Sequence, residues 1–128
     1  MKKDPKIFLE HILESIGYIE EYLKDKGKRD FLKSVQLQDC VIRRLEVIGE
    51  AVKNLPREFK NKYPHIPWKE IAGTRDILIH HYFGVDLNLT WEIATKRLKK
   101  LKRDILKIKK DLEVKDKHKD VLEKEKKK

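Results

Sequence analysis

The sequence predicts an all-α protein, a single domain folded as an antiparallel bundle of four to five helices. At 128 residues the chain is long enough for one core and too short for two. Charged residues make up 42% and hydrophobic residues 39%, which is typical of helices that each bury one narrow stripe. Strand signals are missing, because the sequence has neither apolar alternation nor an Asn-Gly or Asp-Gly hairpin turn.

Two apolar stripes define the first half of the bundle. The first helix is expected to begin at Asp4 and Pro5, a capping side chain followed by proline in the first turn, and to end near Gly27. The second is expected to begin near Asp30 or Ser34. The stripes consist of apolar residues at three- and four-residue spacing: Leu9, Ile12, Ile16, Ile19 and Leu23, then Val41, Leu45, Ile48, Val52 and Leu55.

Three prolines, at positions 56, 64 and 67, separate the second helix from the third. Residues before proline avoid the helical region, so "PREFKNKYPHIPW" is expected to form a short helical turn and an extended bend. Pro67 is expected to open the third helix. That helix continues, with a kink at Gly73, to an end near Gly84.

The last helix is expected to start with Asp86 or Asn88 as its cap. Its stripe consists of Trp91, Ala94, Leu98, Leu101, Ile105, Ile108 and Leu112. Beyond Val114 the apolar repeat fades. We therefore expect a helical domain over residues 1–113 and a lysine-rich tail, frayed or disordered, over residues 114–128.

The formal net charge of +10 is concentrated in the last quarter of the chain. Residues 96–128 hold 16 Lys and Arg against 7 Asp and Glu, whereas the preceding residues hold 16 against 15. Such a segment attracts phosphate polymers through counterion release, so one hypothesis is a basic nucleic-acid-binding protein and the other is a solubilising tail. The single Cys40 fits a reducing compartment, and no apolar run approaches the roughly 18 residues of a membrane span. We expect a cytoplasmic protein.

The segment "GTRDILIHHYFGVD", residues 73–86, carries a concentration of chemically active side chains. Histidine exchanges protons near neutral pH, and the fork of arginine donors matches phosphate oxygens. Arg75 and His80 together suit attack on an RNA phosphodiester by its own 2′-hydroxyl. His80 moves the proton, Arg75 stabilises the charged transition state, and no metal is required. Asp76 can orient the arginine.

Other interpretations of this segment remain open at the level of residues. Adjacent helical residues point about 100° apart, so His80 and His81 do not face one metal ion. A purely structural interpretation pairs Arg75 with a surface carboxylate, buries His80 and half-buries Tyr82. Five residues on an ideal helix rotate by about 140°, so Arg75 and His80 lie on different faces. They converge if the helix ends near Gly84, if the arginine reaches around it, or if a two-fold dimer brings two copies together.

The string "RDILIHHY" resembles the motif of HepT-like toxins in the HEPN superfamily, which reads Arg, four residues, His, one residue, Tyr. The flanking "RRLEVIGEAVKNLP", "YPHIPWKEIAG" and "TWEI" are similar as well, so the resemblance extends from about Val41 to Trp91. It implies a HEPN-like bundle that forms a homodimer, with the two motifs along a shared cleft.

The resemblance also implies a function, that of the toxin in a type VII toxin–antitoxin system. Such toxins are metal-independent endoribonucleases without a cofactor, in which Arg75 and His80 correspond to the catalytic pair and Asp76 to the supporting polar residue. Tyr82 corresponds to the tyrosine that a cognate minimal nucleotidyltransferase antitoxin (MNT) adenylylates to silence the toxin. His81 also precedes this tyrosine, but the motif spacing selects His80.

A non-catalytic helical subunit that binds nucleotides or a partner enzyme is the alternative hypothesis, in which the motif serves for contacts alone. Glu50 and Asn54 lie one turn apart on the second helix and are left out of the site, because hydrogen bonding on the helix surface accounts for them equally well. Trp68 and Trp91 are expected to be core or dimer-contact residues, in preference to base-stacking residues.

Overall fold

The computed structural model describes residues 4–78 and 86–126, and within them the side chains of Arg75, Ile77 and residues 119–126 are not described. These residues form helices and no strand, so the predicted all-α class is confirmed. The elements are α1 (Pro5–Leu23), α2 (Lys28–Lys33), α3 (Val35–Asn54), α4 (Arg57–Asn61), α5 (Trp68–Ala72), α6 (Thr74–Leu78), α7 (Leu87–Glu92), the π-helix η1 (Ile93–Arg97) and α8 (Leu98–Lys126).

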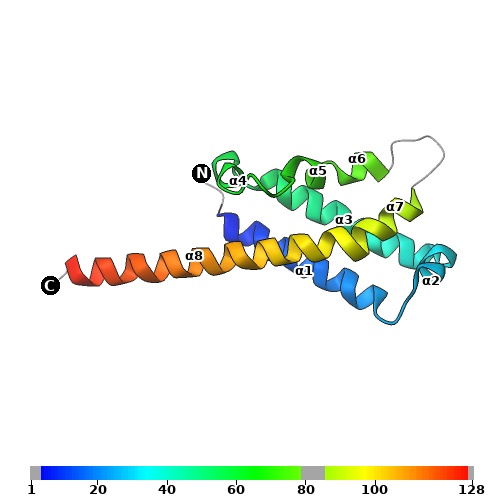
Figure 1. The fold of residues 1–128 in the computed structure, drawn as a ribbon, viewed down its shortest axis with the longest axis horizontal. Helices are drawn as coiled ribbons and strands as arrows, with labels where there is room; N and C mark the ends of the chain where they lie inside the picture. The colour runs from blue at the N-terminus through cyan, green and yellow to red at the C-terminus, as the bar shows by residue number, and fades with distance from the viewer. Residues whose placement is uncertain (1–3, 79–85, 127–128) are drawn as a thin grey trace.

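The helices form an antiparallel bundle, as predicted (Figure 1). Helix α3 runs back along α1, the pair α5 and α6 runs along α3 in the opposite direction, and α8 returns along α1. Three of the four bundle positions hold long helices of 19, 20 and 29 residues. The position of the predicted third helix is filled by two short helices, α5 and α6, which meet at Gly73.

Three predicted helix starts are confirmed by their caps. The side chains of Asp4, Ser34 and Asp86 each accept a hydrogen bond from a backbone N–H two or three residues along the chain, at 3.0, 3.1 and 3.0 Å. These bonds satisfy donors that have no partner within the helix. Of the alternatives left open by the sequence, Ser34 therefore caps the second long helix, and Asp86 caps the helix that precedes η1.

The predicted helix end at Gly27 is wrong. Helix α1 ends at Leu23, and Asp25 then adopts a positive φ of 61°, in the left-handed region that aspartate tolerates. Gly27 instead precedes α2, with its N–H donating to Asp30 Oδ2 at 2.9 Å. Helix α2 itself was not predicted, yet it delivers Phe31 to the core, with its ring centroid 5.5 Å from that of Trp91.

The predicted stripes meet in one core. Most of their members are nearly or fully buried, and the core also takes in the aromatic side chains of the proline-rich connection. Its largest fully buried side chains are Phe31, Leu9, Ile12, Ile16, Ile19, Ile48, Ile105 and Ile108. Within this bundle, α3 packs against both α5 and α6, the short helices that lead into and begin the motif.

Helix α8 crosses the expected boundary at residue 113 without a break, and its helical backbone continues to Lys126. Figure 1 shows this end of the helix extending beyond the rest of the bundle. Val114 is 63% exposed, in line with the fading of the apolar stripe. The division into residues 1–113 and 114–128 stays a prediction. None of the helices in the described part of the chain is long and apolar enough to cross a membrane.

Candidate functional site

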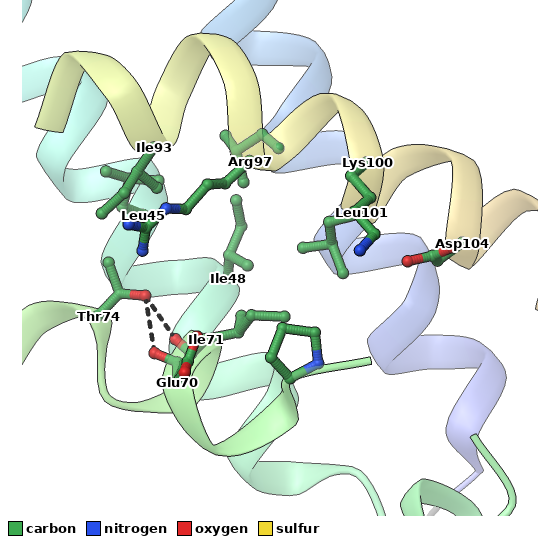
Figure 2. Close-up of a pocket in the computed structure, with 12 residues that line it drawn as sticks. Leu45, Ile48, Glu70, Ile71, Thr74, Ile93, Arg97, Lys100, Leu101 and Asp104 are labelled. Atoms are coloured by element: carbon green, nitrogen blue, oxygen red, sulfur yellow. Dashed lines mark hydrogen bonds between the residues drawn. The ribbon is translucent and has the colours of Figure 1, made fainter. Parts of the chain in front are cut away.

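The first part of the motif lies on α6, directly after the break at Gly73. Thr74 opens this helix, and its hydroxyl Oγ1 donates to the carbonyl oxygens of Ile71 at 2.8 Å and Glu70 at 3.2 Å (Figure 2). Thr74 is only 7% exposed, so both hydrogen bonds are largely shielded from water. The side chain thus ties the start of α6 to the end of α5 and fixes the angle between them.

A close approach of two backbones sets α5 against α3. A Cβ atom at Gly49 would lie 3.2 Å from the carbonyl oxygen of Ala72 and 3.3 Å from that of Ile71. Those distances are tighter than ordinary van der Waals contact, so only glycine fits between the helices without displacing α5. This close contact gives a physical reason for the glycine in the "IGEA" block. The sequence signal was a glycine inside an apolar helical stripe.

Trp68 fixes the other end of α5. It is 8% exposed, and its Nε1 donates to the carbonyl oxygens of Lys60 and Tyr63, both at 3.1 Å. The prediction that Trp68 is a core residue is confirmed.

Burial raises the pKa of the Tyr63 phenol, and the nearby carboxylate of Asp111 raises that pKa further.

The candidate catalytic residues are only partly covered by the structure. Arg75 is the second residue of α6, so its backbone is placed while its side chain lies outside the description. Asp76 follows it with an exposed side chain. His80, His81 and Tyr82 lie outside the described residues. The structure thus gives the position and support of α6, and the convergence of Arg75 with His80 stays a prediction.

The ends of the segment that holds the rest of the motif are joined to each other. The backbone N–H of Asp86 donates to the carbonyl oxygen of Leu78 at 3.2 Å. Leu78 is 2% exposed and anchors the end of α6 in the core, while Asp86 caps α7. The end of α6 and the start of α7 therefore lie beside each other in the bundle.

A pocket of about 220 Å³ lies beside α6, between that helix, α3, α5 and the η1–α8 segment. Arg97 and Lys100 enter it from η1 and α8, opposite Thr74 and Glu70 (Figure 2). Its apolar wall is formed by Leu45, Ile48, Pro67, Ile71, Ile93, Leu98 and Leu101. Such a pocket can hold a group with apolar faces and polar edges. Arg97 ends a π-helical turn, and such turns often occur at functional sites.

Sequence reasoning missed Arg97 and Lys100 because both belong to a helix face crowded with lysines and arginines. No local spacing separates them from their solvated neighbours. Asn54, which was left out of the site together with Glu50, forms a hydrogen bond along α3, in which its Nδ2 donates to the Glu50 carbonyl at 2.9 Å. Among the described residues, no group of three or more His, Cys, Asp or Glu side chains is arranged to hold a metal ion.

The bundle and its motif define the class of the protein. An antiparallel helical bundle in which an Arg-x4-His motif begins at a break between two short helices is HEPN-like. The family model described as Ribonuclease HepT-like matches residues 12–108, and the chain belongs to this family.

Several curated relatives are similar over most of the chain. A Methanocaldococcus jannaschii protein named as a gamma-glutamylcyclotransferase and putative RNase is 65% identical over 113 residues, 88% of this chain and 51% of that protein. The chain thus spans about half the length of this relative. A second protein of that organism, named as a putative RNase, is 48% identical over 90% of this chain and 95% of its own. A Thermococcus cleftensis protein named as a probable ribonuclease HepT is 46% identical over 86% of this chain and 100% of its own. No solved structure is significantly similar to the chain.

Proposed function

We propose that this protein is a metal-independent endoribonuclease that acts as a homodimer, with Arg75 and His80 of the two copies along a shared cleft. The observation that carries the proposal is the intact motif in a HepT-like chain, starting on a short helix that is fixed at both ends. Support comes from the tight packing at Gly49 and the bond from Thr74, because catalysis demands side chains held in place.

The chemistry needs only the RNA and the side chains. His80 accepts the proton of the 2′-hydroxyl while the 2′-oxygen bonds to phosphorus, and the bond from phosphorus to the 5′-oxygen breaks. A proton returned to that oxygen leaves a 5′-hydroxyl end and a 2′,3′-cyclic phosphate. Arg75 stabilises the negative charge on the phosphorane-like transition state, and Asp76 orients the arginine. In a two-fold dimer one His80 can act as base and the other as acid.

Regulation follows from the position of Tyr82 within the motif. We propose that the protein is the toxin of a type VII toxin–antitoxin pair in the cytoplasm, silenced when a cognate minimal nucleotidyltransferase adenylylates Tyr82. The added group carries a phosphate and a bulky base. Placed two residues from His80, it competes with the substrate phosphate for Arg75 and His80.

The test uses protein made without any partner gene and shown by intact mass to carry no adenylyl group. Wild type, His80→Ala and the neighbouring control His81→Ala are incubated with total RNA in EDTA. We expect cleavage by wild type and His81→Ala and none by His80→Ala, with all three proteins folded and dimeric. Loss of cleavage in His81→Ala alone would move the catalytic role to His81. Absence of cleavage by every protein would favour the non-catalytic partner-binding subunit.

A further inference from the structure

A second, larger pocket lies on the other side of α5. It has a volume of about 700 Å³ and is bounded by the end of α3, by α4, by the proline-rich connection and by α5. Figure 1 shows α4 and the start of α5 beside the C-terminal end of α3. We call this pocket the basic groove, because four cations line it: Lys53, Arg57, Lys60 and Lys69.

The charge of the basic groove is not balanced within its lining, which contains no aspartate or glutamate. Two of the cations are engaged: Lys53 pairs with Glu50 at 3.4 Å, and Lys60 Nζ donates to the carbonyl oxygen of Val52 at 3.2 Å. Arg57 and Lys69 are exposed, and among the described residues neither forms an ion pair. Both therefore remain available to an anion.

The walls of the basic groove are held in place before any ligand binds. Trp68 lines the groove, and its Nε1 is bonded to two carbonyl oxygens of the connection. Two prolines, at 64 and 67, stiffen the same stretch. Ala72, the last residue of α5, also lines the groove and stands three residues before Arg75. A chain of phosphates bound in the groove would thus lie beside the end of α5 that leads into α6, the motif helix, which carries Arg75.

We propose that the basic groove binds the phosphate backbone of a single-stranded RNA and leads that strand to the motif on α6. Arg57 and Lys69 make the phosphate contacts, because cations without carboxylate partners release counterions when a polyanion binds. The guanidinium of Arg57 offers a planar fork that matches two phosphate oxygens. The proposal deepens the proposed function and rests on it for the substrate class.

The experiment measures binding without cleavage. A fluorescent 2′-O-methyl oligoribonucleotide lacks the attacking hydroxyl, so its dissociation constant can be followed by anisotropy over a range of salt concentrations. Wild type is compared with the double variant Arg57→Gln, Lys69→Gln. The matched control is Arg29→Gln, Lys99→Gln, which removes the same charges from exposed positions that line neither described pocket and form no ion pair among the described residues.

We expect the groove variant to bind about tenfold more weakly near physiological salt, because each phosphate contact contributes about 0.7 to the logarithmic salt slope of single-strand binding. Its slope should fall by about 1.4 for two contacts. The control should show less than half of either change. Equal losses in both variants, or none in the groove variant, would overturn the proposal, since binding would then depend on overall charge or on another surface such as the C-terminal lysines.

Failure of the groove is distinguishable from failure of the proposed function. His80→Ala should bind the 2′-O-methyl oligonucleotide with the wild-type salt slope while cleaving nothing. If the groove variant bound and cleaved RNA as the wild type does, RNA binding by the basic groove would be refuted and the proposed ribonuclease activity would stand. Conversely, if binding depended on the groove but no protein cleaved RNA, the proposed ribonuclease activity would be refuted and the groove would stand as an RNA-binding surface. Thermal unfolding of each variant verifies that it is folded.

Discussion

Substituting Gly49 by alanine tests whether the contact between α3 and α5 holds the motif helix in position. The new Cβ would sit 3.2 and 3.3 Å from two carbonyl oxygens of α5, below the 3.4–4 Å of ordinary contact. Both obstacles are backbone atoms, so α5 as a whole must move, and α6 moves with it. Overpacking of this kind typically costs about 1–3 kcal/mol.

The opposing effect is helix propensity, since alanine in place of glycine stabilises a helix interior by about 1 kcal/mol. Gly17 provides the matched control, because it lies inside α1 with nothing within 4 Å of its added Cβ. We expect Gly17→Ala to raise the free energy of unfolding by about 0.5–1 kcal/mol, the full propensity gain. The free energy of unfolding of Gly49→Ala should be about 1–3 kcal/mol lower than that of Gly17→Ala, because of the cost of overpacking.

Urea denaturation of the wild type and both variants measures this difference, and each 1 kcal/mol corresponds to about 4 °C in Tm for a chain of this size. RNA cleavage should also fall in Gly49→Ala and stay at the wild-type rate in Gly17→Ala. If both variants were stabilised equally and cleaved RNA equally well, the idea that this contact positions the motif helix would be refuted.

Three further substitutions probe the supports of the site. Thr74→Val keeps the side-chain shape but removes the hydroxyl that bonds the Ile71 carbonyl, so the free energy of unfolding should drop by about 1 kcal/mol in urea. Thr74→Ser is its control and should lose less than half of that. Asp86→Ala removes the cap of α7 and should cost about 1 kcal/mol, measured as a lower Tm, whereas Asp86→Asn should retain most of it. Trp68→Phe deletes the Nε1 donor, so it should lower the Tm and weaken binding of the 2′-O-methyl oligonucleotide. Unchanged binding would show that RNA binding by the basic groove does not depend on the hydrogen bonds of Trp68.

The parts of the fold that the sequence predicted are those encoded locally. Asp4 and Ser34 act as caps through their own side chains, and the apolar stripes bury because helical spacing alone brings them to one face. Helix α2 escaped prediction because six residues are too few to show a stripe. The end of α1 was misplaced because Asp25, rather than glycine, adopts the left-handed conformation there.

The candidate site divides in the same way. Arg75 and His80 stand in one short stretch, so a motif reveals them, whereas the predicted convergence of their side chains would depend on tertiary structure that no spacing specifies. The basic groove takes its cations from three separate segments: α3, α4 and α5. In the sequence each of these residues looks like an ordinary solvated lysine or arginine, and only the packing of α5 against the connection assembles them.

The most direct test of the central claim is the chemistry of the RNA ends produced in EDTA by protein free of adenylyl groups. If Arg75 and His80 act on the 2′-hydroxyl, every cut should leave a 2′,3′-cyclic phosphate and a 5′-hydroxyl, and substitution of either residue by alanine should remove the cuts. Cleavage that requires Mg²⁺ and leaves 3′-hydroxyl and 5′-phosphate ends would contradict the mechanism.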